Sequence, residues 1–262
     1  MKVFGTRPGN PLARAFSAHL VETLAYRDRD VWIVSPWIRD VELPLDELGH
    51  VRSLLPEGST TIRLSVLLTR IAQQHALVTI TKPPHELVPL DRLPVLIRKL
   101  RQRSMLLERP PEDPRMAELV RTLDEDVGHL ARDLTVHRES FSIGRRLAFC
   151  GADVRYLNRL HAKATWTPAS SFVGSANFTY GGLFANEEMM LEVTDERAHS
   201  EVRAALEAIT DRATPLSEYN FADALRRQRV SELDVLESTT SNLLDGLAPL
   251  KKLLEELSEL LR

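Results

Sequence analysis

The sequence has little cysteine, no strong charge of either sign and no long apolar run. Among its 262 residues there is one cysteine, Cys150, so an intrachain disulfide is impossible and we expect a reducing compartment. No apolar stretch approaches the ~20 residues of a membrane-spanning helix, and the N-terminal residues lack the apolar core of a signal peptide. We therefore expect a cytoplasmic protein with no membrane partner.

The net charge of −3 does not indicate a nucleic-acid binder, because such domains are usually strongly basic. Basic residues nevertheless gather locally, in residues 98–103 and again at Arg145, Arg146, Arg155 and Arg159. A solvated helix face is the simpler interpretation of the first cluster. The second cluster precedes the motif described below, so Arg155 and Arg159 are candidates for guiding a phosphate.

Hydrophobic residues make up 43% of the chain, which is enough for a sizeable core. Periodicity predicts alternating helices and strands in the first part of the sequence, with helices over residues 11–26 and 45–55 and strands over residues 31–38 and 61–69. A strand–helix–strand order of this kind favours a parallel crossover. Trp37 and Trp166 could stack on nucleic-acid bases or pack in the core.

Residues 82–140 depart from this pattern and are rich in proline. Two charged helical stretches, residues 93–107 and 115–134, lie between the prolines, and we interpret the segment as a helical insertion. It could form a lid, a substrate collar or a partner surface, or simply pack on the edge of the sheet. A further helix over residues 137–150 should lead into a strand at Val154.

The C-terminal tail, residues 231–262, carries leucines at intervals that alternate between four and three residues: Leu243, Leu247, Leu250, Leu254, Leu257 and Leu261. That spacing is typical of a coiled-coil seam. The tail could pair with a second copy or a partner, or it could fold onto its own domain.

The richest chemistry lies in residues 161–188, here called the motif segment. His161 and Lys163 would share one face of a strand, because side chains repeat every second residue. Residues 171–173 predict a second strand that ends at Gly174, and residues 186–193 a third, with Glu188 able to reach back toward His161.

The motif segment resembles the phospholipase D superfamily, whose signature runs His-x-Lys, Asp, Gly-Ser-x-Asn and Asn-x-Glu. The matching residues are His161, Lys163, Gly174, Ser175, Asn177, Asn186 and Glu188. The superfamily's aspartate is missing, since Pro168 stands in its place. The resemblance and the predicted elements imply an α/β fold, a mixed, largely parallel sheet flanked by helices, over residues 1–230.

The resemblance also implies a mechanism without a metal or cofactor. His161 would attack phosphorus and form a phosphohistidine, while Lys163, Ser175 and Asn177 hold the phosphate oxygens and Glu188 orients the imidazole. Gly174, Asn186, Arg155, Arg159 and Trp166 are the candidate substrate-binding residues.

A second histidine must protonate the leaving oxygen, but no other histidine of the chain stands in such a motif. We therefore expect a homodimer, or a higher oligomer, that joins two copies of His161. The resemblance implies a nuclease acting on DNA, as in restriction or phage defence, with an ATPase or helicase as a candidate partner. A non-catalytic nucleic-acid-binding or scaffold subunit, with Pro168 as a sign of decay, and a phospholipase or phosphatidyltransferase are the alternatives.

Overall fold

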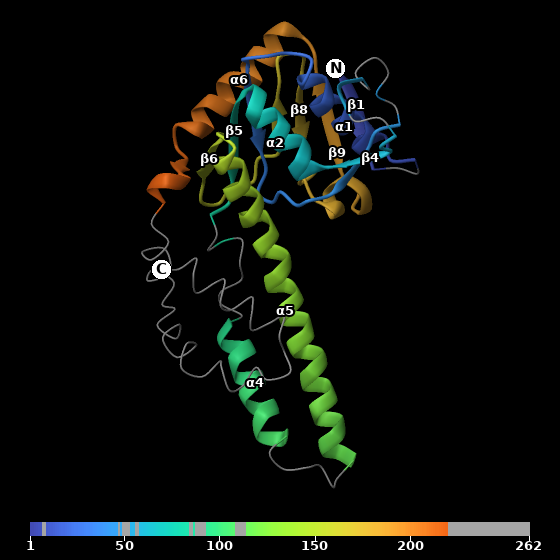
Figure 1. Ribbon diagram of the computed structural model, residues 1–262, viewed down its shortest axis with the longest axis vertical. Helices are drawn as coiled ribbons and strands as arrows, with labels where there is room; N and C mark the ends of the chain where they lie inside the picture. The colour runs from blue at the N-terminus through green and yellow to red at the C-terminus, as the bar shows by residue number, and fades with distance from the viewer. Residues whose placement is uncertain are drawn as a thin grey trace. The chain divides into compact units, whose positions relative to one another are not determined.

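The computed structural model (Figure 1) describes residues 1–6, 9–46, 48, 53–55, 58–83, 86, 93–107 and 114–219. These residues divide into two compact units, one formed by Met1–Pro83 with Glu139–Tyr219 and the other by Pro84–Arg138. The C-terminal leucine seam lies outside the described residues, as does most of the helix expected over residues 45–55. Within the described ranges, no helix is both long and apolar enough to cross a membrane.

The first unit is built on a mixed sheet flanked by helices, which confirms the predicted α/β class. Its strands lie in the order β1-β9-β8-β7-β2-β5-β6-β10. Their bounds are β1 Lys2–Gly5, β2 Asp30–Val34, β5 Ala76–Thr81, β6 Asp153–Tyr156, β7 Ala164–Trp166, β8 Ser171–Gly174, β9 Met189–Val193 and β10 Thr214–Pro215. Parallel pairing is less extensive than expected: among the described strands it joins β2 to β5 and β5 to β6, and the other pairs of this sheet are antiparallel.

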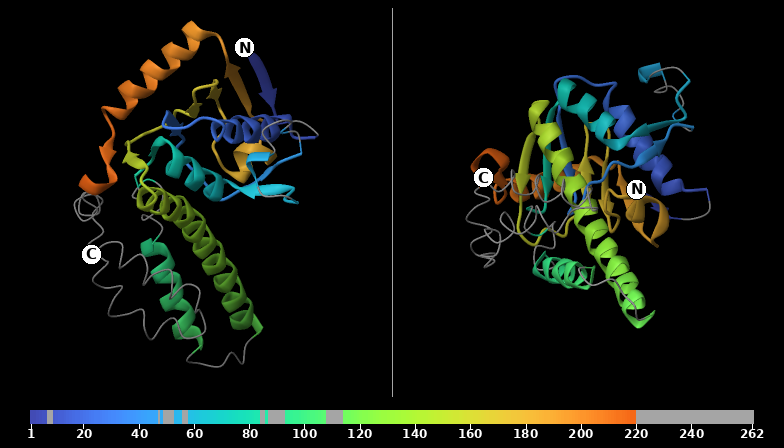
Figure 2. Two further views of the ribbon diagram at one scale, coloured as in Figure 1. Left: turned by 45° about the horizontal axis from the view of Figure 1, so that its top comes forward. Right: turned by 60° about the horizontal axis from the view of Figure 1, so that its bottom comes forward.

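Helices cover the two faces of this sheet (Figures 1 and 2). On β2, Val31 and Ile33 pack with α1 (Pro11–Thr23), α2 (Leu64–Gln74) and the last turns of α5 (Pro114–Phe149). Trp32 and Val34 point to the other face and pack with α6 (Glu196–Thr210). This alternation reflects the two-residue period of a strand, and it explains why β2 is buried throughout.

The strand predicted over residues 61–69 is wrong. Only Thr61–Arg63 is extended, as β4, which pairs with β3 (Glu42–Pro44) in a separate two-stranded sheet, and α2 begins at Leu64. Leu64, Leu67, Leu68 and Ile71 recur with helical spacing and are all buried. The parallel partner of β2 is instead β5, so a crossover between parallel strands exists with α2 as its helix. A short buried apolar run does not distinguish a strand from a helix by periodicity.

The second unit contains α4 (Leu93–Leu107) and the first part of α5. The stretches expected as separate helices over residues 115–134 and 137–150 form one continuous helix, α5. Lys99 forms an ion pair with Asp126, and Arg103 with Asp124, so two residues of the basic cluster 98–103 bind acidic residues of α5.

A helical turn and a short 3₁₀ turn complete the first unit. The π-helix η3 (Gly181–Ala185) joins β8 to β9, and η4 (Leu216–Glu218) follows β10. The N-terminus of α6 is capped by Asp195, whose carboxylate accepts a hydrogen bond from the N–H of Ala198 at 3.0 Å.

Candidate functional site

The residues of the motif segment gather along one edge of the eight-stranded sheet, which is the edge formed by the ends of strands β2, β5 and β8 and the starts of strands β7 and β9. The strand pairing fixes this edge: Val34, at the end of β2, lies opposite Ala164, at the start of β7. Gly174, at the end of β8, lies opposite Met190, near the start of β9. Residues that precede β7 and β9 or follow β2, β5 and β8 therefore meet at this edge. Antiparallel pairing brings residues 161–163, 175–177 and 186–188 together there.

Lys163 lies against His161 at this edge. Its ammonium donates a hydrogen bond to the backbone oxygen of His161 at 2.7 Å, and Nζ stands 3.2 Å from the imidazole Nδ1. Lys163 is buried, with 6% of its surface exposed, whereas His161 is exposed. The two residues are thus adjacent, but not by strand alternation, because β7 begins only at Ala164. An exposed imidazole beside a buried cation can meet a phosphate from solvent.

Burial lowers the pKa of Lys163, and the nearby charge of Lys82 lowers it further, while Glu188 raises it. A depressed pKa means that the ammonium is incompletely solvated and gains more from a bound anion than a surface lysine would. Lys163 therefore lies among Glu188, Lys82 and His161.

Ser175 and Glu188 are hydrogen-bonded to each other. The hydroxyl of Ser175 donates to the carboxylate of Glu188 and accepts from the N–H of Met189 at 3.1 Å. We expected Glu188 to reach His161, but among the described residues its carboxylate bonds to Ser175 rather than to the imidazole. The serine that would hold a phosphate oxygen is thus oriented by the glutamate.

Two glycines of the motif segment are required by backbone packing. A Cβ on Gly174 would stand 2.2 Å from the backbone oxygen of Met189, and one on Gly182 would stand 2.2 Å from that of Asn177. We expected the missing side chain of Gly174 to let a ligand approach the backbone. In the structure it is the backbone of strand β9 that approaches Gly174 closely. The Oδ1 atom of Asn177 is buried and has no hydrogen-bond partner within the described part of the chain. Such unpaired buried groups are rare and recur at functional sites.

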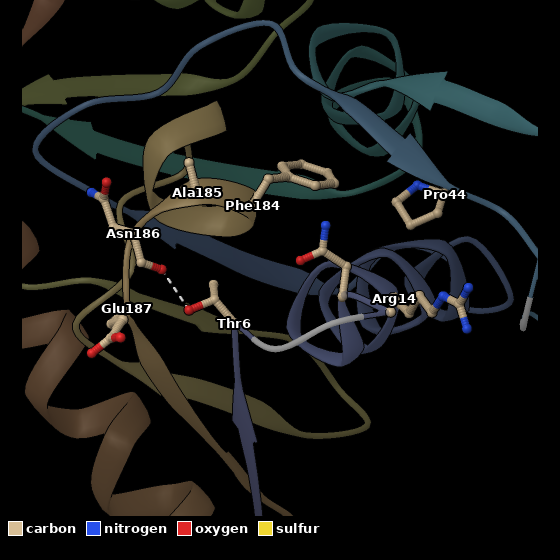
Figure 3. Close-up of a pocket in the computed structure, with 9 residues that line it drawn as sticks. Thr6, Arg14, Pro44, Phe184, Ala185, Asn186 and Glu187 are labelled. Atoms are coloured by element: carbon tan, nitrogen blue, oxygen red, sulfur yellow. Dashed lines mark hydrogen bonds between the residues drawn. The ribbon is translucent and has the colours of Figure 1, made fainter.

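The first strand fixes the end of the motif segment. The hydroxyl of Thr6 accepts from the N–H of Glu188 at 2.9 Å and donates to the backbone oxygen of Asn186. The N–H of Thr6 donates to the backbone oxygen of Glu188 at 3.2 Å. Thr6, Asn186 and Glu187 also line a pocket of about 590 Å³ together with Gly9, Asn10, Arg14, Pro44, Phe184 and Ala185 (Figure 3).

Lys82 and Trp37 belong to the same edge, and Lys82 was not identified from the sequence. Lys82 follows β5 directly, and its ammonium lies 4.9 Å from the centre of the Trp37 ring. The hydroxyl of Ser35 donates to the backbone oxygen of Trp37 at 2.8 Å and accepts from the N–H of Phe178 at 3.3 Å. A strand ending at Thr81 would have been the signal for Lys82, but the sequence pattern placed that strand earlier, over residues 61–69.

Pro168 lies in the turn of the β7–β8 hairpin, at the end opposite His161. The N–H of Thr167 donates to the backbone oxygen of Ser170 at 3.0 Å, which closes the turn around Pro168. Proline at the second position of such a turn is favoured because its φ is already fixed. The residue that replaces the superfamily's aspartate therefore has a structural role of its own.

Two of the expected substrate-binding side chains are engaged elsewhere. Trp166, a candidate for base stacking or for core packing, lies in the core: it is 8% exposed, packs edge-on against Trp32 and stacks on the ring of His199 at 4.7 Å. Arg155 forms an ion pair with Asp153 at 2.8 Å and donates to the backbone oxygen of Thr210. Arg159 is exposed in the turn that precedes His161.

Three other described histidines are not exposed as His161 is. His19 is buried between the hydroxyls of Thr165 and Ser170, at 2.8 and 3.0 Å, and burial lowers its pKa to about 3. His75 is also buried, and burial lowers its pKa. His199 is half-buried: its ring stacks on Trp166, and its Nε2 lies 3.0 Å from the backbone oxygen of Thr167. Across the described ranges, no three His, Cys, Asp or Glu side chains lie close enough to hold a metal ion.

The fold and the site thus define an α/β protein with a histidine, a lysine, a serine and a glutamate at one sheet edge, as in the phospholipase D signature. No family model and no curated protein matches the chain. Solved structures that it resembles include NucT from Helicobacter pylori, at 11% identity and a TM-score of 0.45, covering 82% of this chain and 98% of that one.

Two further solved structures match at similar identity and TM-score. Nuc from Salmonella typhimurium, described as a phospholipase D family member, matches at 9% identity and a TM-score of 0.42, covering 82% of this chain and 95% of that one. Phosphatidylserine synthase from Haemophilus influenzae matches at 12% identity and a TM-score of 0.42, covering 99% of this chain and 45% of that one. These likenesses are too distant to assign an activity, so we infer function from this chain's own residues.

Proposed function

We propose that this protein is a phospholipase D-like phosphodiesterase that cleaves DNA through a covalent phosphohistidine at His161. The observation that supports this proposal most strongly is the exposed imidazole of His161 beside the buried ammonium of Lys163, at 3.2 Å. Ser175, oriented by Glu188, lies at the same edge of the sheet. A nucleophile, a fixed cation and an oriented hydroxyl are the groups that phosphoryl transfer without a metal requires.

In the proposed reaction, a ring nitrogen of His161 attacks phosphorus and a P–N bond forms as the P–O bond to the leaving group breaks. The leaving oxygen takes a proton from a general acid. Water then attacks phosphorus, gives a proton to that same group, and breaks the P–N bond, which restores His161. Lys163 and Ser175 would stabilise the charge on the non-bridging oxygens in both steps.

The general acid in this proposal is His161 of a second copy of the chain. Support comes from three of the other histidines in the described ranges: His19 and His75 are buried, and His199 is stacked on a core tryptophan. A two-fold assembly that joins the two sheet edges would supply one histidine from each copy. General acid catalysis of this kind contributes typically ~10²–10⁴-fold.

The position of Pro168 favours retained catalysis over a decayed scaffold. It occupies a hydrogen-bonded turn at the far end of the hairpin, and the contacts among His161, Lys163, Ser175 and Glu188 are formed without it. A supporting carboxylate at this position is therefore not needed to hold the groups of the site.

The test is cleavage of labelled single- and double-stranded DNA by the purified chain in EDTA. We expect cleavage in the chelator, loss of cleavage in His161→Ala, and full cleavage in His129→Ala, which removes an exposed histidine of α5. Acid quenching would destroy a phosphohistidine, whereas alkaline quenching should preserve a labelled protein adduct that His161→Ala lacks.

Three results would contradict the proposal. Cleavage that survives in His161→Ala would mean that another nucleophile or a contaminant is responsible. DNA binding without cleavage or adduct, by a dimer shown to be intact, would favour the scaffold alternative. Headgroup release from phospholipid vesicles, absent in His161→Ala, would instead select the lipid-directed alternative.

A further inference from the structure

We infer that the pocket between β1, α1 and η3 binds an unstacked nucleobase next to the scissile phosphate, which makes single-stranded DNA the preferred substrate. This inference rests on the proposed function, because it places the pocket beside a phosphate held at His161. The pocket has a volume of about 590 Å³, within the usual range of ligand sites and large enough for a nucleoside.

The pocket adjoins the catalytic edge through a continuous stretch of backbone. Asn186 and Glu187 line it, and the next residue, Glu188, is bonded to Ser175 at the site. Thr6 lines the pocket as well and holds Glu188 by its N–H and hydroxyl. Two residues of extended chain cover about 7 Å, a separation that a single nucleotide spans.

An aromatic pair supplies a stacking surface at this pocket. Phe184 lines the pocket, and its ring stacks on that of Tyr180 with centroids 5.4 Å apart and an angle of 14° between the planes. Tyr180 is 66% exposed, whereas Phe184 is half-buried and packs with one side against the core. A half-buried ring that lines a pocket and is braced by an exposed tyrosine is suited to a base, since every base offers a π-face.

The polar groups of the pocket match an uncharged base better than a second phosphate. Arg14 is already paired with Asp46 at 2.8 Å, and Glu187 adds a negative charge. The amides of Asn10 and Asn186 each carry donors and acceptors, as the edges of bases do. Figure 3 shows Phe184, Asn186 and Arg14 around the pocket, from η3, the segment before β9, and α1.

A base in this pocket must leave its stack, and this requirement sets the preference for one strand. Extruding a paired base from a duplex costs a few kcal/mol, whereas an unpaired base costs least. The pocket would therefore favour single-stranded over double-stranded DNA, whereas Lys163 and Ser175 would bind the phosphate of both substrates equally.

The experiment measures binding to the full chain carrying His161→Ala, so that DNA stays uncut. The probes are two single-stranded trinucleotides, one with 2-aminopurine at its centre and one with an abasic centre. We expect the base to tighten binding at least about fivefold and its fluorescence to be quenched by stacking. Phe184→Leu and Asn10→Gly should each remove most of that advantage. Glycine preserves the left-handed backbone at Asn10, whose φ is 52°.

A matched control is Phe149→Leu, the same change at a phenylalanine that is 93% exposed on α5 and outside the pocket. It should keep the full preference for the base. If both pocket variants also keep it, or if the two trinucleotides bind equally, the inference is wrong.

Failure of the proposed function is read separately, from DNA cleavage by the chain with His161 intact. Cleavage in EDTA without any base preference would leave the phosphodiesterase proposal standing and remove the pocket inference. A base preference that depends on Phe184 and Asn10, in a chain that never cuts DNA, would support base binding in the pocket and contradict both the phosphodiesterase proposal and the substrate preference derived from it.

Discussion

The burial of His19 predicts a specific acid sensitivity of this fold. The imidazole lies between two hydroxyls, stacks against Phe172 at 4.7 Å and has a pKa of about 3 in the folded chain, against 6.5 for an exposed histidine. Burial is the main cause, and the charge of His199 adds to it. Between pH 6.5 and 3 the unfolded chain therefore binds a proton that the folded chain does not, so stability falls as the pH falls.

The size of this effect follows from the two pKa values. One pKa unit corresponds to ~1.4 kcal/mol, and integrating from pH 7 to pH 5 gives a loss of about 2 kcal/mol in the free energy of unfolding due to His19 alone. Above pH 7 the contribution is complete, because His19 is neutral in both states.

The assay is urea unfolding at pH 7, 6 and 5 and fixed protein concentration, followed by the fluorescence of the buried Trp32 and Trp166. The variant His19→Gln keeps hydrogen-bonding groups but cannot titrate. It should be less stable at pH 7, yet lose about 2 kcal/mol less than the wild type between pH 7 and pH 5. Other groups, such as His75, titrate in both proteins and cancel. Equal losses in the two proteins would refute the reasoning.

Three further predictions concern the site and the hairpin that carries it. Lys82→Gln should lower kcat/KM for DNA about tenfold and raise the pKa of Lys163, measured by NMR, because a positive neighbour is removed; an unchanged pKa would show that the two charges do not interact. Gly174→Ala should destabilise the protein by roughly 1–3 kcal/mol, since its Cβ would stand 2.2 Å from a backbone oxygen of β9. Gly144→Ala, where a Cβ meets its nearest neighbour at 3.6 Å, should be tolerated; comparable losses in thermal unfolding would contradict this. Pro168→Asp should leave nuclease activity within about twofold and cost roughly 0.5–1 kcal/mol of stability; a large gain in cleavage would mean that the missing carboxylate matters.

Local signals predicted part of the fold well. The spacing of Phe16 and Leu20 predicted α1, and both side chains are buried. The Gly174-Ser175 step predicted the end of β8, and the apolar run of residues 31–38 predicted β2, although that strand ends at Val34. These elements are specified by residues close in sequence, so periodicity alone reveals them.

The segment around residues 61–81 shows where the sequence was insufficient. Two neighbouring segments, Leu64 to Gln74 and Ala76 to Thr81, each carry several buried apolar residues. Packing on the sheet decides which one is a helix. Because the strand was predicted too early, Lys82 was not recognised as a candidate site residue. Its place at the site follows from its position directly after the end of β5.

Within the site, the sequence predicted which residues gather but not how they pair. The antiparallel hairpin brings His161, Lys163 and Ser175 to one edge, as their spacing indicated. The bond from Ser175 to Glu188 depends on the register of β8 against β9 and could not be predicted. The burial of Trp166 likewise depends on α6, a helix far along the chain.

The hydrogen bonds between Thr6 and Glu188 join residues that lie 182 positions apart in the sequence. During synthesis the N-terminal strand must therefore wait for β9 to emerge before its edge is paired, and contacts of such long sequence separation are slow to form. The last glutamate of the signature would be fixed only when the two ends of the sheet have met. A chain shortened by its first six residues would retain every group of the motif segment and lose the strand that holds the end of it in register.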